Sequence, residues 1–342
     1  MNHRTLGRTG IPVSPLTLGT LMFGAWGNTD HDECVRIVHA ALDAGITTID
    51  TADVYSFGES EEIVGRALKG RRDEVVLATK FGSPMDDSPH RRGNSRRWIV
   101  RAVEDSLRRL DTDYIDLYQV HRPDPDTDVD ETLGALSDLV RQGKVRAVGT
   151  SNFPAEELVE AQWAAERRGR ERFGSEQPSY SIMARHAEAA VLPVAERYDL
   201  GVMVWSPLNG GWLTGKYRRD APPPADSRAT RNAEHFDYRA EHVRATKFDL
   251  TEKLTALADE AGLPLMHLAL GFVLSHRAVS SAVIGPRTLE QLAGHLGAER
   301  VRLTPDLLDA IDELVPPGTN VGGPAEIGHV PHVLTDAALR RR

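Results

Sequence analysis

The stretch that decides the fold is residues 75–120, where VVLAT at 75–79 and IDLYQV at 115–120 flank a helical pattern at 97–110. Both outer runs are short and largely apolar, as expected of strands that are buried on both faces. Between them, apolar residues recur every three or four positions, which predicts a helix with one buried side. Residues 75–120 therefore form a strand–helix–strand unit, the building block of parallel α/β folds.

The same unit recurs on both sides of this stretch. Further strands are predicted at 16–19, 48–52, 145–149, 177–180, 202–205 and 282–284. Helical spacing recurs at 32–44, 130–142, 154–168, 187–198, 250–261 and 289–296. Eight strands alternating with helices fit either a doubly wound open sheet or a closed barrel. The strand count, and the lack of G-x-G-x-x-G after an early strand, favour an α/β fold of the (β/α)8 TIM barrel type.

We expect a single barrel domain over residues 1–342, because no linker divides the chain. Residues 1–15 are predicted to form an N-terminal hairpin that closes the barrel bottom, and residues 305–314 an extra C-terminal helix. Residues 218–244, after the seventh strand, contain three consecutive prolines and predict a flexible loop over the mouth. A plain surface insertion is the alternative for this loop. Residues 335–342 are expected to be a frayed tail.

Composition narrows the class of protein. The chain carries a net charge of −9, with 40% hydrophobic and 27% charged residues, as in ordinary globular proteins. The acidic balance argues against a nucleic-acid partner, and no apolar stretch is long enough to span a membrane. The single cysteine, Cys34, and the polar first ten residues favour a cytoplasmic protein. Arginine far outnumbers lysine among the 41 basic residues, which suggests a bacterial, GC-rich genome. No spacing indicates a metal site.

Four titratable side chains follow the predicted second, third and fourth strands: Asp50, Tyr55, Lys80 and His121. Strand ends in a barrel meet at one mouth, so we expect these groups to converge. Each alone has an ordinary structural explanation, such as a cap or a packing residue. Together, a carboxylate would hold the ammonium and the ammonium would lower the phenol pKa. Such a set suits proton donation to a carbonyl oxygen while hydride reaches its carbon.

The runs TTIDTADVY at 47–55, LATK at 77–80 and LYQVHR at 117–122 resemble strand signatures of the aldo-keto reductase superfamily. The resemblance covers nearly the whole chain. Within the superfamily, the sequence is similar to the branch that contains bacterial aldo/keto reductases and potassium-channel β subunits. It implies that Tyr55 is the general acid. Lys80 and Asp50 would tune it, and His121 would orient the carbonyl.

The family's cofactor, NADPH, implies a further set of contacts across the barrel mouth. Ser151, Asn152 and Gln177 would hold the carboxamide, and Trp205 would lie under the nicotinamide. Arg287 could grip the 2′-phosphate with two parallel hydrogen bonds, although a solvated helix start is its structural alternative. The cofactor-binding residues implied are Thr20, Leu21, Asp50, Ser151, Asn152, Gln177, Trp205, Ser206, Pro207, Leu208, Gly211, Gly215, Lys216, Gly285, Arg287, Gln291 and His295. His295 stands where the family commonly has Asn.

The resemblance implies an NADPH-dependent oxidoreductase that reduces an aldehyde or ketone to an alcohol. One alternative is a sugar-nucleotide keto or enoyl reductase of deoxysugar biosynthesis, to which AVIGPRT at 282–288 is similar. Another is a non-catalytic NADPH-binding regulatory subunit, because channel β subunits share Trp205, but those typically have Asn in place of His121. The expected partner is a small carbonyl compound, and a homo-oligomer stays open. Candidate apolar residues lining the pocket are Met22, Phe23, Trp26, Phe57 and Met85.

Overall fold

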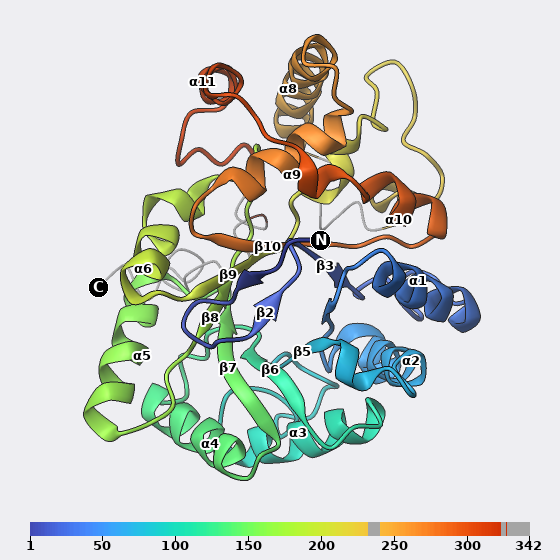
Figure 1. Ribbon diagram of the computed structural model, residues 1–342. Helices are drawn as coiled ribbons and strands as arrows, with labels where there is room; N and C mark the ends of the chain where they lie inside the picture. Colours follow the sequence, from blue (N-terminus) through green and yellow to red (C-terminus); the bar gives the residue numbers. More distant parts are fainter. Residues whose placement is uncertain (232–239, 323–325, 327–342) are drawn as a thin grey trace.

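The computed structural model describes residues 1–231, 240–322 and 326, and its centre is a closed barrel of eight parallel strands (Figure 1). Around the barrel the strand order is β10-β3-β4-β5-β6-β7-β8-β9. The strands are β3 (Leu16–Gly19), β4 (Thr48–Asp50), β5 (Val76–Phe81), β6 (Ile115–Val120), β7 (Val145–Ser151), β8 (Ser175–Gln177), β9 (Gly201–Val204) and β10 (Val279–Ile284). The predicted TIM barrel is confirmed.

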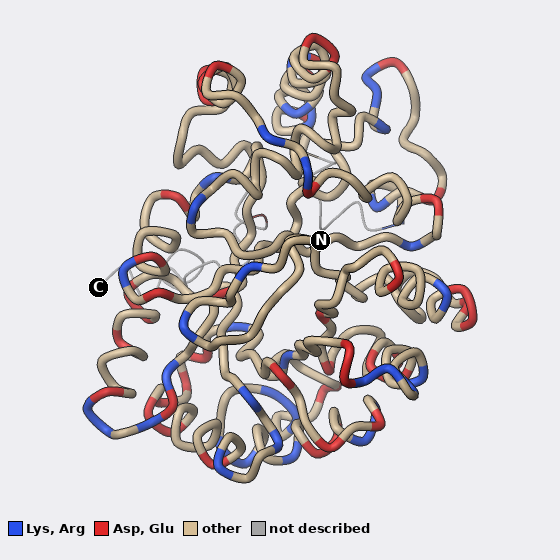
Figure 2. Tube along the Cα trace, in the orientation of Figure 1, with Lys and Arg blue, Asp and Glu red and all other residues tan. Residues whose placement is uncertain are grey.

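Helices surround the barrel on its outer side (Figure 1). They are α1 (His31–Asp43), α2 (Glu59–Ala67), α3 (Arg96–Arg109), α4 (Val129–Arg141), α5 (Ala155–Arg168), α6 (Val191–Tyr198), α7 (Arg228–Arg231), α8 (Glu241–Glu260), α9 (Leu265–Ser275), α10 (Leu289–His295) and α11 (Pro305–Leu314). Each contributes buried apolar residues to one core cluster that also includes strand residues, and Figure 2 shows acidic and basic residues interspersed on the outer helical turns. The extra C-terminal helix, α11, has the predicted bounds.

Strand burial follows the expected pattern of a covered parallel sheet. Every residue of β3 and β4 is buried, and fully burying one such aliphatic side chain stabilises the fold by about 1.5–3 kcal/mol. In register, Asp50 lies beside Gly19 on one side and Ala78 on the other. Two small neighbours leave room at this end of β4, so the Asp50 side chain can face the polar residues of the mouth.

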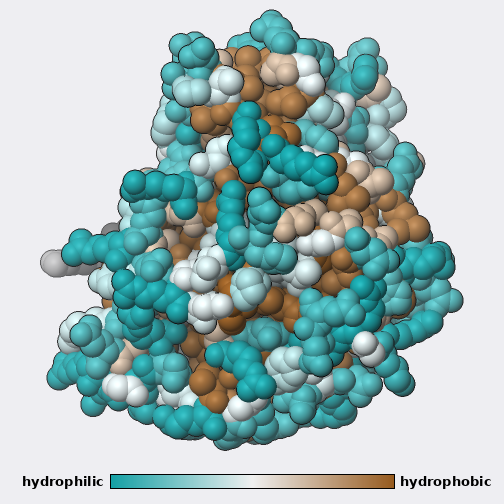
Figure 3. All heavy atoms as spheres, in the orientation of Figure 1, coloured by the Kyte–Doolittle hydropathy of each residue, from teal (hydrophilic) through white to brown (hydrophobic). Residues whose placement is uncertain are grey.

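The N-terminal hairpin pairs β1 (Arg4–Thr5) with β2 (Pro12–Val13) in antiparallel fashion, as predicted. At its turn, Gly7 has φ +50°, and a Cβ there would lie 2.4 Å from the backbone nitrogen of Gly201. Leu6 is fully buried in a cluster with Leu117 and Met203. The hairpin therefore covers the amino-terminal end of the barrel, and on this face hydrophilic residues predominate over scattered apolar ones (Figure 3).

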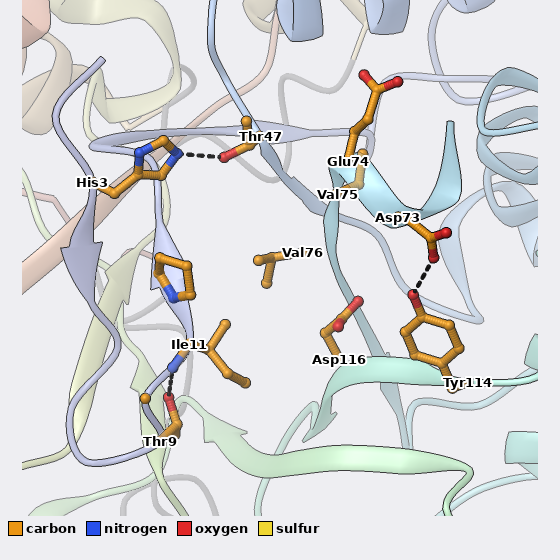
Figure 4. Close-up of a pocket in the computed structure, with 12 residues that line it drawn as sticks. His3, Thr9, Ile11, Thr47, Asp73, Glu74, Val75, Val76, Tyr114 and Asp116 are labelled. Atoms are coloured by element: carbon orange, nitrogen blue, oxygen red, sulfur yellow. Dashed lines mark hydrogen bonds between the residues drawn. The ribbon is translucent and has the colours of Figure 1, made fainter. Parts of the chain in front are cut away.

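A pocket lies between the hairpin and the strands at this closed end (Figure 4). His3 Nε2 and Thr47 Oγ1 are 2.9 Å apart across one side, and the Tyr114 hydroxyl donates to Asp73 at 3.2 Å on the other. Of its acidic side chains, Asp116 accepts a 2.7 Å bond from Arg72. These contacts tie the hairpin side and the strands together at the end of the barrel that is opposite the polar strand ends.

Some predicted element bounds are wrong. Strand β8 lies at Ser175–Gln177, two residues before the predicted start, because its buried residues Ser175 and Glu176 are polar and the apolar pattern missed them. Helix α8 begins at Glu241 and α7 lies at Arg228–Arg231, so the predicted loop 218–244 is partly helical. Residues 232–239 of that loop and the predicted tail 335–342 lie outside the described residues.

Two sizeable helices escaped prediction, α2 and α9. Helix α9 is apolar on nearly all sides, and eight of its eleven residues are buried, so it lacks the polar face that creates helical periodicity. Among the described residues, no single helix is long and apolar enough to cross a membrane. The pair α8 and α9 passes the same length and composition test jointly, with an 89° bend between them.

Candidate active site

The carboxyl ends of all eight barrel strands carry residues that the sequence singled out. From β3 round to β10, these residues are Thr20, Asp50, Lys80, His121, Ser151, Gln177, Trp205 and Gly285. The convergence predicted from strand ends is therefore present. Two groups of side chains lie at this mouth. The polar centre surrounds the Lys80–Asp50 pair. The basic margin consists of Lys216, Arg228, Arg231 and Arg287.

The polar centre is built on an ion pair between Lys80 and Asp50. The Lys80 ammonium lies 2.6 Å from Asp50 Oδ2, donates to the carbonyl of Thr51 at 2.8 Å, and reaches the Tyr55 hydroxyl at 3.4 Å. Both members of the pair are almost completely buried. Burial alone would lower the Lys80 pKa, but Asp50 and Tyr55 outweigh burial and raise it. Lys80 is therefore a permanent cation beside the phenol.

Tyr55 differs from the expectation in its acidity. Burial raises the pKa of the Tyr55 phenol above its ordinary value, and the Lys80 ammonium offsets only part of the rise. The lowered Tyr55 pKa that the sequence suggested is wrong for this structure, because the sequence shows the neighbouring charge but not the depth of burial. Tyr55 consequently holds its proton at neutral pH.

His121 lies beside Tyr55, with ring centroids 5.8 Å apart and the planes at 78°. Burial, Lys80 and Arg122 hold its pKa well below the usual value, so the imidazole is neutral at physiological pH. Its buried Nδ1 has no hydrogen-bond partner among the described residues. A neutral imidazole carries one N–H donor, so His121 can share an oxygen with Tyr55.

A chain of side-chain contacts runs from the ion pair across the mouth. Gln177 Nε2 donates to Asp50 Oδ1 at 2.9 Å, and Ser151 Oγ donates to the carbonyl of Gln177 at 2.8 Å. The amide of Asn152 donates to Ser151 Oγ at 2.9 Å and accepts from Trp205 Nε1 at 3.0 Å. Five predicted residues thus form one connected network. Its members hold each other's positions.

Two buried residues beside this network were missed by the sequence interpretation. Gln119, on β6, donates to Asp50 Oδ1 at 3.3 Å, and Glu176, on β8, is fully buried directly before Gln177. Glu176 accepts a 2.5 Å bond from Thr150 Oγ1 and a 3.2 Å bond from the backbone N–H of Phe153. These bonds secure the turn at Asn152, which has φ 62°. The signal available was Glu176 itself, a charged residue directly before the predicted strand start at 177.

We expect Glu176→Gln to become progressively more stable than the parent protein as pH rises from about 4.5 to about 8. Burial raises the Glu176 pKa from 4.5 to about 8, so over this range only the folded state keeps the proton. The parent should lose stability by roughly 1.4 kcal/mol per pH unit, whereas glutamine mimics the protonated carboxyl and loses none from this site. Urea unfolding of both proteins at pH 5, 6, 7 and 8 measures the difference. A difference that stays constant with pH would contradict the assignment.

The basic margin consists of the four cationic residues Lys216, Arg228, Arg231 and Arg287, with the carboxylate of Asp226 beside Arg287. Arg287 Nη2 lies 2.7 Å from Asp226 Oδ2 and also donates to the Asp226 carbonyl at 2.9 Å. The Lys216 pKa is lowered mainly by burial, and further by the charges of Arg228 and Arg287. The Arg228 pKa is also lowered mainly by burial. Tyr217 opposes this shift, and Arg231 and Arg287 add to it by repulsion. A cluster of mutually repelling cations of this kind is a candidate region for binding an anion. Arg228 and Arg231 were missed, because they lie in the segment predicted as an irregular loop.

The turn after β9 brings Lys216 into this margin. Gly211 has φ +100°, a backbone conformation that favours glycine, and a Cβ there would lie 2.8 Å from Lys216 Cε. Ser206 Oγ accepts from the N–H of Gly210 at 3.2 Å, and the N–H of Gly211 donates to Leu208 at 2.9 Å. Pro207, between Ser206 and Leu208 in the sequence, is buried. The turn ends at Gly215, which has φ +74°.

The remaining predicted residues lie at the edges of the two groups. Thr20 donates its N–H to the Asp50 carbonyl at 2.9 Å, and Leu21 follows it half-buried. Gln291 Oε1 accepts from the backbone N–H of Arg287 at 2.8 Å. His295 is buried, with Nδ1 2.5 Å from the carbonyl of Gln291. Gln291 thus orients the start of α10, whereas His295 is engaged within its own helix.

Comparison with known proteins agrees with this geometry. Residues 15–316 match the family model described as the aldo/keto reductase family. The oxidoreductase YrpG of Bacillus subtilis is 41% identical, over 92% of this chain and 96% of its own length. A probable voltage-gated potassium channel subunit beta of Arabidopsis thaliana is 36% identical over 92% and 97%. Aldo-keto reductase YhdN of Bacillus subtilis is 37% identical over 85% and 87%. The chain belongs to the aldo/keto reductase family of oxidoreductases.

Proposed function

We propose that this protein reduces an aldehyde or ketone to an alcohol with NADPH as hydride donor. The observation that carries the proposal is a protonated, half-buried Tyr55 whose hydroxyl lies 3.4 Å from Lys80 and whose ring meets the neutral His121. A carbonyl oxygen bound between Tyr55 and His121 would receive hydrogen bonds from both. The polar centre then has a proton donor, a fixed cation and an orienting imidazole in one place.

The proton moves from Tyr55 Oη to the carbonyl oxygen as negative charge develops there. Bound NADPH supplies the hydride to the carbonyl carbon. The phenolate left on Tyr55 is stabilised by the Lys80 ammonium, an interaction of about 5 kcal/mol at this separation and an effective dielectric constant of about 20, before desolvation is counted. Asp50 keeps that ammonium in place, and Gln119 and Gln177 keep Asp50 in place. The high Tyr55 pKa is compatible with this role because the proton leaves only in the transition state.

The residues present fit NADPH at both ends of the mouth. At the polar centre, the amide and hydroxyl groups of Ser151, Asn152 and Gln177 can bind a carboxamide, and the Trp205 ring lies among them. At the basic margin, Lys216 and the three guanidiniums offer a set of donors suited to phosphate oxygens. Arg287 is held at this margin by its ion pair with Asp226.

We expect Arg287→Ala to raise the Kd for NADPH roughly 10-fold or more while changing the Kd for NADH little. The guanidinium, fixed by Asp226 on one side, is placed to pair with the 2′-phosphate that NADH lacks. Fluorescence titration with each cofactor measures both constants. Arg300→Ala is the matched control, because Arg300 is 86% exposed and pairs only with Glu299 among the described residues. Equal weakening for both cofactors would remove Arg287 from the phosphate site.

A second function is favoured by one observation, the 36% identity to a probable potassium channel subunit beta. In that case the chain would bind NADPH as a regulatory subunit without turnover. Absorbance at 340 nm with a panel of aldehydes, ketones and sugar-nucleotide ketones separates the two. Consumption of NADPH with a carbonyl compound supports the reductase, and tight binding without consumption supports the subunit.

A further inference from the structure

Glu176 is a buried carboxyl group without a cation. Its side chain is 0% exposed, and it forms no ion pair with any residue that the structure describes. Its hydrogen bonds come from neutral donors, the Thr150 hydroxyl at 2.5 Å and the backbone N–H of Phe153 at 3.2 Å. Glu61, which is equally buried, is paired with Arg109. Fully buried glutamates are rare unless a cation balances them, so the unpaired state of Glu176 needs an explanation.

The elements around Glu176 supply no charge to it. In register, Glu176 lies beside Thr150 on β7 and Val202 on β9. The acidic residues in the first turn of α5 are Glu156 and Glu157, and Glu156 helps to raise the pKa of Glu157. Among the described residues, neither of these groups nor any other charged side chain shifts the pKa of Glu176.

Glu176 can nevertheless ionise within the folded protein. Burial raises its pKa to about 8, and hydrogen bonds from Thr150 and from the backbone N–H groups of Asn152 and Phe153 oppose the rise. These bonds favour the ionised form, because a carboxylate accepts them better than a carboxyl group does. A positive charge brought close to Glu176 would favour the ionised form further.

The position of Glu176 connects it to the amide and hydroxyl groups that are suited to a carboxamide. Gln177 follows it directly in β8, and Ser151 Oγ donates to the carbonyl of Gln177. The bond from Phe153 joins Glu176 to the turn that presents the Asn152 side chain. A nicotinamide held by these three polar side chains would therefore place its ring on the side of the mouth where Glu176 is buried.

The other titratable groups at this end of the mouth are not available to balance a new cation. Gln177 donates to Asp50, whose carboxylate is already paired with Lys80. His121 is neutral at physiological pH. Glu176 is therefore the carboxyl group beside the carboxamide-binding residues whose charge has no partner among the described residues.

We propose that Glu176 is the counter-charge of the oxidised nicotinamide ring and makes the protein bind NADP+ more tightly, relative to NADPH, as pH rises. The oxidised ring carries a positive charge that the reduced ring lacks. An ionised Glu176 attracts this charge, whereas a protonated Glu176 does not. The inference rests on the proposed cofactor and adds a residue that distinguishes its two oxidation states. Glu176 acts on cofactor affinity through its charge and takes no part in the proton transfer from Tyr55.

The test measures the ratio of the Kd for NADP+ to the Kd for NADPH at pH 6.5, 7.5, 8.5 and 9.0, by quenching of tryptophan fluorescence. In the parent protein, this ratio should fall about 3- to 10-fold over the range, which corresponds to about 0.7–1.4 kcal/mol. In Glu176→Gln the ratio should stay constant, because the amide is neutral at every pH. Glu156→Gln is the matched control, since Glu156 is exposed on α5, and it should behave like the parent protein.

A second variant keeps the test decisive if Glu176→Gln does not fold. Thr150→Val preserves the shape of the side chain but removes the hydroxyl that donates to Glu176. The ionised carboxylate then loses one of its hydrogen bonds, so the fall in the ratio should move to higher pH.

The outcomes separate this inference from the proposed function. A ratio that does not change with pH in the parent protein, with both cofactors bound, would overturn the role of Glu176 and leave the cofactor proposal intact. The same fall in Glu176→Gln as in the parent would also overturn it, because another group would then be responsible. If the parent protein binds neither cofactor, the proposed function is wrong, and this inference with it.

Discussion

Phenylalanine in place of Tyr55 is expected to lower kcat for carbonyl reduction by roughly 100- to 10,000-fold, the usual contribution of a positioned general acid. The substitution removes only the hydroxyl that lies 3.4 Å from the Lys80 ammonium. The ring contacts with Trp26 and His121 remain, so the mouth keeps its shape. Steady-state NADPH oxidation at 340 nm measures the loss.

The control for this variant is Tyr118→Phe. Tyr118 lies on β6, is fully buried and stacks on Phe81, and its hydroxyl has no hydrogen-bond partner among the described residues. Loss of that hydroxyl should leave kcat unchanged. The Kd for NADPH should be nearly the same in both variants and in the parent protein. If Tyr55→Phe weakens NADPH binding as much as it slows turnover, Tyr55 is a structural residue and the mechanism is wrong.

Arg109→Met is expected to destabilise the fold by about 3–5 kcal/mol, because it leaves a buried carboxylate without its cation. Glu61 is completely buried, lies 2.7 Å from Arg109, and accepts from Thr79 Oγ1 at 2.6 Å. Asp53 is buried close by, and both its oxygens lack hydrogen-bond partners among the described residues. Burial, then Glu61, raise the Asp53 pKa well above its ordinary value, whereas Glu61 is paired directly with Arg109. The shift in the urea unfolding midpoint measures the effect.

The neighbouring Arg108→Met is the matched control. Arg108 is 70% exposed and pairs with Asp105 at 2.7 Å, and exposed pairs of this kind contribute at most about 1 kcal/mol. A double variant, Glu61→Gln with Arg109→Met, should recover part of the lost stability because no buried charge remains. If Arg109→Met and Arg108→Met unfold at the same urea concentration, the buried pair is not stabilising the fold.

The sequence predicted the barrel well where one physical signal dominated. Apolar runs located β3 and β6 with the observed bounds, because strands covered on both faces must be apolar. The prediction failed where a buried element lacks the usual pattern of apolar and polar positions. Glu176 and Ser175 sit in a strand without an apolar pattern, and α9 has no polar face to reveal its period.

The candidate site, like the barrel, could be predicted only in part from the sequence. Asp50, Lys80 and His121 were found because strand ends meet in a barrel, and this rule needs only the chain order. The acidity of Tyr55 was not predictable, since it depends on how deeply the phenol is buried. Arg228 joins the basic margin through the fold of a segment whose sequence resembles a loop. Phe57 could be named as apolar, but only the structure shows that its backbone is left-handed, with φ 55°.

The pairing of β3 with β10 has a consequence for how the protein is made. Leu16 lies beside Ala282, so the barrel closes only when strands from the two ends of the chain meet. At ribosomal rates of about 5–20 residues per second, β3 waits on the order of tens of seconds for that neighbour. Throughout this interval one edge of the nascent sheet offers unpaired backbone groups to other chains. Until β10 has left the ribosome, this edge is the part of the nascent barrel that is open to pairing with other chains.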